Sequence, residues 1–201
     1  METFTSEYAQ GRWDRTKVLG VQLVPLTIDH ALLLWHLKSP FLTGEMEAVT
    51  VDGVTMRLAT LGKMVTTLYV LTRPCDEAAT AMHRLRTAWR LRFWGWQLAR
   101  RFGLAGRIAA QTAIERYLED SFSEPVRWET QRTVHTSICH APFLQVLKVR
   151  LQLCLGESRA GALSYPVREA LWDLACFEED SGRSEWVGAA ESADIRRLTT
   201  N

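Results

Sequence analysis

The chain has 201 residues, of which 47% are hydrophobic and 23% are charged, and its formal net charge is +1. This composition is close to the average of globular proteins, which excludes a disordered chain, a collagen-like repeat and a small disulfide scaffold. At this length, folding buries roughly 70% of the surface that the unfolded chain exposes, so a sizeable core can form. The balanced charge provides no overall field that would attract nucleic acid or an anionic membrane.

Neither a targeting signal nor a membrane span is expected. Residues 1–15 mix acidic residues with arginines and lack the apolar run of a secretory signal. The most apolar stretches, 27–37 and 64–71, are shorter than the ~20 residues that a membrane-spanning helix needs. The cysteines are widely spaced without a CxxC pair, which favours buried free thiols. We therefore expect a soluble, cytoplasmic protein that has no membrane partner.

Apolar residues recur at helical spacing, beginning with a helix that either Thr27 or Asp29 can cap through a side-chain oxygen. This helix is predicted to end at Ser39-Pro40, because a residue before proline avoids the helical conformation. The stretch 48–57 contains Asp52-Gly53, the signature of a two-residue hairpin turn. It is predicted either as a short β-hairpin or as a loop that leads into a helix over 56–72.

The rest of the chain has the same helical character. Further helices are predicted over 74–102, 107–122 and 137–155, from Pro166 onward, and over 189–198. A break at 103–106 separates the first two of these helices, and Gly156 stops the third. The predicted fold is mainly α, a single compact multi-helix domain over 1–201. It comprises an extended segment 1–24, a helical N-terminal half 25–122 and a helical C-terminal half 133–201.

The segment 82–107 combines arginines with aromatic side chains and contains no acidic residue. This combination contacts phosphates and stacks on bases, and it also suits the interfacial zone of a membrane. The arginines, however, scatter around more than half of the helix. We therefore favour an interpretation in which Trp89, Phe93 and the other aromatic residues are buried and the arginines reach solvent. The candidate residues for the alternative, nucleic-acid binding, are Arg84, Arg90, Arg92, Arg100 and Arg101.

Motifs for catalysis or metal binding do not occur in the sequence. There is no GxSxG, GxxxxGK[ST] or GxGxxG. His135, Cys139 and His140 are close enough on a helix to share a metal, but neither CxxC nor HExxH accompanies them, so ordinary helix packing is favoured. The consecutive carboxylates at 178–180 point in different directions on a helix. We predict no catalytic residue, no metal site and no cofactor.

Two segments, 26–42 and 170–186, have the character of association surfaces. Both carry large apolar side chains of the type found at interface centres. The candidate partner-binding residues are Leu34, Trp35, Phe41, Trp172 and Trp186. The alternative is that these side chains pack against one another in the core.

The sequence PLTIDHALLL at 25–34, continuing to Ser39-Pro40-Phe41-Leu42, resembles small helical proteins encoded in phage-tail-like gene clusters. The end of the chain, with Trp172, Ser181-Gly182, Trp186 and Glu191, is similar to the same group, which is of the tail assembly chaperone type. The resemblance covers about the first quarter and the last fifth of the chain. It implies a mostly helical, non-catalytic protein that coats the tape measure protein until tail tube subunits replace it.

We therefore expect a non-enzymatic helical assembly protein that binds a partner protein, such as a tape measure or other tail protein, in the host cytoplasm. A target helix would lie in an apolar groove of this chain. Self-association into a homo-oligomer is compatible with this role. The alternatives are a nucleic-acid-binding protein that uses the helix 82–107 and a structural tail or connector subunit of the virion.

Overall fold

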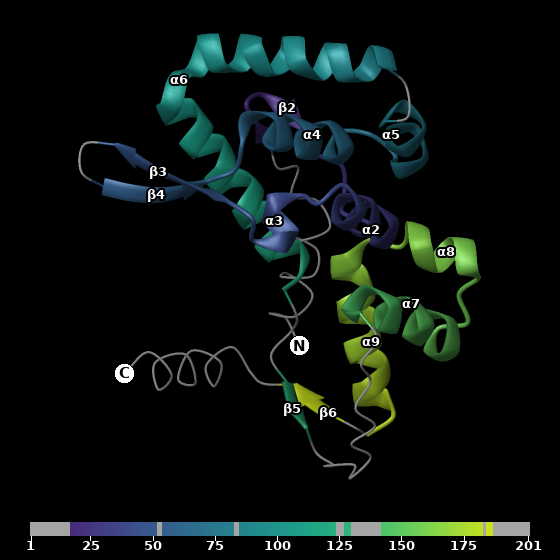
Figure 1. The fold of residues 1–201 in the computed structure, drawn as a ribbon. Coiled ribbons are helices and arrows are strands. Elements are labelled where there is room, and N and C mark those ends of the chain that lie inside the picture. The colour runs from purple at the N-terminus through teal and green to yellow at the C-terminus, as the bar shows by residue number, and fades with distance from the viewer. Residues whose placement is uncertain are drawn as a thin grey trace. The chain divides into compact units, whose positions relative to one another are not determined.

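The computed structural model describes residues 17–51, 54–82, 85–123, 127–129, 142–182 and 184–186. In these ranges the fold is mainly helical with short antiparallel strand pairs, which confirms the predicted fold class (Figure 1). The chain divides into two compact units, the first formed by Arg15–Ser121 and the second mainly by residues after Ser121. That these units form a single domain stays a prediction.

The first unit opens with short elements around one capped helix. They are β1 (Lys17–Val18), β2 (Val21–Gln22), α2 (Ile28–His36) and α3 (Pro40–Thr43). Of the two predicted cap residues, Thr27 caps α2: its side chain accepts from the backbone N–H of His30, while the His30 ring accepts from the backbone N–H of Thr27. The other ring nitrogen of the buried His30 lies 2.8 Å from the carbonyl oxygen of Arg73. The histidine thus joins the start of α2 to a distant loop.

The predicted hairpin is confirmed. Strands β3 (Glu47–Val51) and β4 (Val54–Leu58) pair antiparallel, with Glu47 opposite Leu58 and Val51 opposite Val54. The helix that follows is α4 (Leu61–Leu71), so residues 56–58 belong to a strand and not to the helix of the alternative prediction. A strand forms there because cross-strand partners satisfy its backbone groups.

Helix α4 supplies much of the core of the first unit. Its buried side chains include Met64, Val65, Leu68 and Leu71. It contacts α2, α5 (Cys75–Met82) and α6 (Leu85–Ser121). Gly103 interrupts α6 with non-helical backbone angles, φ 57° and ψ −157°, and the helix changes direction there (Figure 1). The predicted break is therefore confirmed at one residue, with helical structure on both sides.

In the described residues of the second unit, three helices pack beside one strand pair. Its elements are β5 (Arg127–Glu129), α7 (Phe143–Cys154), α8 (Arg159–Ser164), α9 (Val167–Asp180) and β6 (Ser184–Trp186). Its core contains Leu147, Leu151, Val167, Leu171 and Leu174. Gly156 follows α7 at φ 70°, which confirms the predicted stop. Helix α8 is not among the helices predicted from the sequence, and the predicted helix over 189–198 lies outside the described residues.

None of the helices in the described ranges is both long and apolar enough to cross a membrane.

Candidate functional site

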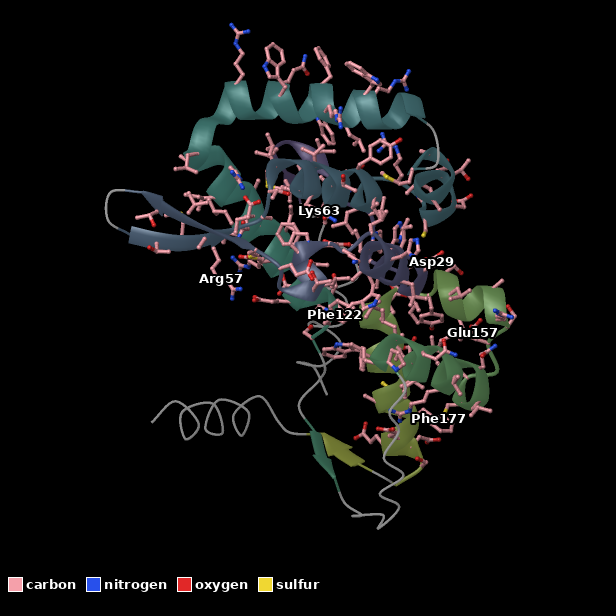
Figure 2. The ribbon with its side chains drawn as sticks, in the orientation of Figure 1. Asp29, Arg57, Lys63, Phe122, Glu157 and Phe177 are labelled. Atoms are coloured by element: carbon pink, nitrogen blue, oxygen red, sulfur yellow. The ribbon has the colours of Figure 1, made fainter. Side chains whose placement is uncertain are left out.

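Three large aromatic side chains on the first half of α6 are exposed. The exposed fractions are 74% for Trp89, 58% for Phe93 and 54% for Trp96. Their spacing of i, i+4 and i+7 places them on one face of the helix. We call these three residues the aromatic stripe. Figure 2 shows side chains along this part of α6 projecting away from α4.

The opposite side of this half-helix packs on α4 through a glycine. Gly95 is buried, and a Cβ atom placed on it would lie 3.5 Å from Cγ2 of Val65 and 3.8 Å from Cγ of Leu61. The two helices therefore approach closely at this point. A tryptophan ring does not fit in that space, so the largest side chains of the segment face outward.

This arrangement contradicts the expectation that the aromatic residues of 82–107 are buried. That expectation is wrong for Trp89, Phe93 and Trp96, which are all exposed, while Trp94 is half-buried. The physical reason is that α4 fills the core with its own apolar side chains and meets α6 at a glycine. The aromatic stripe is consequently available to a partner.

The aromatic stripe has internal order. The ring centroids of Phe93 and Trp96 are 6.0 Å apart, and their planes differ by 28°. The guanidinium carbon of Arg100 lies 5.4 Å from the centroid of the Trp96 ring, a cation–π distance. Phe93 is on the turn before Trp96 and Arg100 on the turn after it, so ring contacts inside the chain hold Trp96. Part of the Trp96 ring surface is therefore already occupied within the chain, although the side chain is 54% exposed.

The surroundings of the aromatic stripe are positively charged. The side chains of Arg90, Arg92 and Arg100 are exposed, and residues 82–111 include no Asp or Glu. Within the described ranges, none of these three arginines forms an ion pair with a carboxylate. Arg84 and the side chain of Arg101 lie outside the described residues. An incoming anionic group would therefore meet uncompensated guanidinium groups.

The structure separates the predicted partner-binding residues. Trp35 on α2 is 60% exposed, and Phe41 on α3 is half-buried. Leu34 and Trp172 are buried, in the first and second unit respectively. A buried side chain cannot contact a partner while the fold is intact, so Leu34 and Trp172 serve the cores. The side chain of Trp186 lies outside the described residues.

The candidate metal ligands His135, Cys139 and His140 also lie outside the described residues. In the part that is described, no group of three or more His, Cys, Asp and Glu side chains could hold a metal ion. Cys75 is a free thiol, and burial, reinforced by the charge of Asp29, raises its pKa to about 12. A thiol that stays protonated at neutral pH is a poor nucleophile.

Comparison of the chain with protein-family models, curated proteins and solved structures finds no match. The resemblance to tail assembly chaperones therefore stays a prediction. Sequence reasoning had placed Trp89, Phe93 and Trp96 in the core and not among the partner-binding residues. Their one-face spacing groups them in the sequence, but no local signal tells whether that face is buried or exposed.

Proposed function

We propose that this chain is a non-enzymatic assembly protein that binds a partner protein through the aromatic stripe of α6. The observation that carries the proposal is the exposure of three large aromatic side chains at i, i+4 and i+7. A helix with apolar anchors at this spacing is the form that inserts into a hydrophobic groove of another protein. Large aromatic side chains are also the residues that dominate binding energy at interfaces.

In this proposal the chain supplies the helix and the partner supplies the groove. The sequence alone favours the reverse arrangement, in which a groove on this chain receives a helix of the partner. A tape measure or other tail protein as the partner, and hence a tail assembly chaperone, is the finer form of the proposal. It is supported only by the resemblance of 25–42 and of the end of the chain.

Nucleic-acid binding is a second candidate, favoured by the exposure of Arg90, Arg92 and Arg100 beside aromatic rings. Binding of single strands relies on bases that stack on free ring faces. The ring of Trp96, however, already packs against Phe93 and the guanidinium group of Arg100. That ring offers less surface for stacking than a free one, whereas the spacing of the three aromatic side chains on one face suits a groove in a protein. A nucleic-acid complex would weaken steeply with added salt as counterions are released.

The test compares full-length tagged chains incubated with a nuclease-treated lysate of the native host. The test variant is Trp89→Ser/Phe93→Ser/Trp96→Ser, and the control is Leu153→Ser on α7, a side chain that is 79% exposed. We expect the wild type and the control to recover the same proteins from the lysate and the triple variant to lose them. Circular dichroism must show that the triple variant has the same helix content as the wild type. Recovery of the same proteins by all three chains would contradict the proposal.

A separate measurement tests whether the chain is a tail assembly chaperone or a structural subunit of the virion. A chaperone is present during assembly and absent from finished particles, whereas a virion subunit is found in them in fixed stoichiometry. Mass spectrometry of purified particles therefore distinguishes the two roles.

A further inference from the structure

We infer that the partner of α6 has an apolar groove bordered by carboxylates, which holds the aromatic stripe while pairing with Arg90, Arg92 and Arg100. This inference rests on the proposed function and adds the chemistry of the partner. It follows from the positions of the charges around the aromatic stripe, the geometry of the rings and the size of the face.

The arginines surround the aromatic stripe. At 100° per residue, Arg90 and Arg92 lie to opposite sides of Trp89, and Arg100 follows Trp96 along the helix axis. Trp89 and Trp96 are seven positions apart, which corresponds to about 10 Å along a helix. When a groove receives the aromatic stripe, Arg90 can therefore reach one of its borders and Arg92 the other. Carboxylates are the side chains that pair best with such groups.

The ring geometry favours the same partner. Aromatic rings carry partial negative charge on their faces and partial positive charge at their edges. The Arg100 guanidinium carbon lies over the Trp96 ring and the Phe93 ring packs beside it, so part of the Trp96 ring surface is already occupied within the chain. The contacts also restrict the ring before binding, so docking costs less conformational entropy than it would for a free side chain. An acidic groove therefore complements the exposed arginines and receives rings that are already partly ordered.

A second copy of this chain is a poor occupant of the face. Two such faces would bring arginines together without acidic partners, and like charges oppose association. Three aromatic side chains cover at most about 150–250 Å² each. The three side chains together therefore cover at most about 750 Å², which is less than the roughly 800 Å² per partner of a standard stable interface. The aromatic stripe is therefore suited to a narrow groove in a partner that contributes its own charges.

The experiment places a photo-crosslinker beside the aromatic stripe and leaves the stripe intact. Gln97 is exposed on the same side of α6, so benzoyl-phenylalanine replaces it in the full-length chain. After irradiation in the native host lysate, the cross-linked peptide is sequenced by mass spectrometry. Two charge-reversal variants are compared, Arg90→Glu/Arg92→Glu and the matched control Arg116→Glu/Arg159→Glu, whose side chains are exposed elsewhere.

We expect a peptide from another protein in which apolar residues alternate with Asp and Glu. Its yield should fall about tenfold or more with Arg90→Glu/Arg92→Glu and stay unchanged in the control. A neutral or basic peptide, or a yield that ignores both reversals, overturns the inference and leaves the proposed function standing. A cross-linked product with twice the mass of the chain overturns the inference in favour of a second copy, whereas own-chain peptides in a product of single-chain mass are internal cross-links. Cross-links to nucleic acid, or peptides whose yield is unchanged when Trp89→Ser/Phe93→Ser/Trp96→Ser is added to the cross-linking chain, overturn both.

Discussion

The side-chain carbonyl of Gln111, on the second half of α6, accepts a 2.9 Å hydrogen bond from the backbone N–H of Ala59, 52 residues earlier. The amide nitrogen of Gln111 donates to the carbonyl oxygen of Arg57 at 3.0 Å. Arg107, one turn before Gln111, donates to the carbonyl oxygen of Ala59 through its guanidinium group. Side chains of α6 thus satisfy the backbone where the hairpin passes into α4.

Replacing this glutamine should destabilise the first unit. Gln111→Ala leaves the buried N–H of Ala59 without its acceptor, and an unsatisfied buried donor costs about 1–3 kcal/mol. Urea unfolding of the full chain measures the change. The matched control is Arg116→Ala, because Arg116 is exposed on the same helix and its truncation should change the free energy of unfolding by less than about 0.5 kcal/mol. Equal effects at the two positions would contradict the role given to Gln111.

Gly103→Ala should also destabilise the chain. The φ of 57° combined with ψ of −157° is a conformation that essentially only glycine adopts, and forcing another residue into it costs about 1–3 kcal/mol. Among the described residues outside its own stretch of helix, no heavy atom lies within 4 Å of the added Cβ position, so the expected cost is conformational. Thermal unfolding followed by circular dichroism measures it. A melting temperature equal to that of the wild type would show that the backbone at 103 does not require glycine.

Gly95→Ala is expected to have the opposite effect. Gly95 is in regular helix, and the nearest side-chain atom to an added methyl group, Cγ2 of Val65, is at an ordinary contact distance of 3.5 Å. Alanine restricts the unfolded chain more than glycine does, which should stabilise the fold by about 0.5–1 kcal/mol. The same thermal unfolding experiment reads out this gain. A loss of stability would mean that α4 and α6 approach more closely than the structure indicates.

Cys75 should react slowly with alkylating reagents while the chain is folded. Burial, followed by the charge of Asp29, raises its pKa from the ordinary 9.0 to about 12, and only the thiolate is nucleophilic. At pH 8 we expect alkylation by iodoacetamide to be at least tenfold slower in the folded chain than in urea, as followed by mass spectrometry. Equal rates would contradict the raised pKa.

The raised pKa of Cys75 also makes the free energy of unfolding depend on pH in the alkaline range. As the pH rises above 9, the unfolded chain loses the Cys75 proton before the folded chain does. The contribution of the neutral thiol is therefore complete below pH 9 and is lost as the pH approaches 12. Cys75→Ser should reduce this part of the decline, which urea unfolding at several pH values measures.

Local signals in the sequence were sufficient for many parts of the fold. The hydroxyl of Thr27 identified the start of α2, and Asp52-Gly53 identified the hairpin that pairs Val51 with Val54. Gly156 marked the end of α7. These predictions succeed because capping, turn formation and left-handed backbone depend on the residue and its immediate neighbours.

The candidate site could not be predicted in the same way. The one-face spacing of Trp89, Phe93 and Trp96 is the same whether the face is buried or exposed. Which face of α6 is buried depends on α4, whose contact with Gly95 is a tertiary relationship. The general preference of large aromatic side chains for the core therefore gave the wrong answer at this helix.

The break at Gly103 has a consequence for how this surface can change over time. The residues before it meet the proposed partner, whereas Arg107 and Gln111 after it secure the hairpin. Substitutions at separate, non-contacting sites have nearly additive effects on stability. The outward face of the first half of α6 is thus free to diverge with a changing partner, while the contacts of Gly95 with α4 and of Gln111 with the hairpin keep the unit folded.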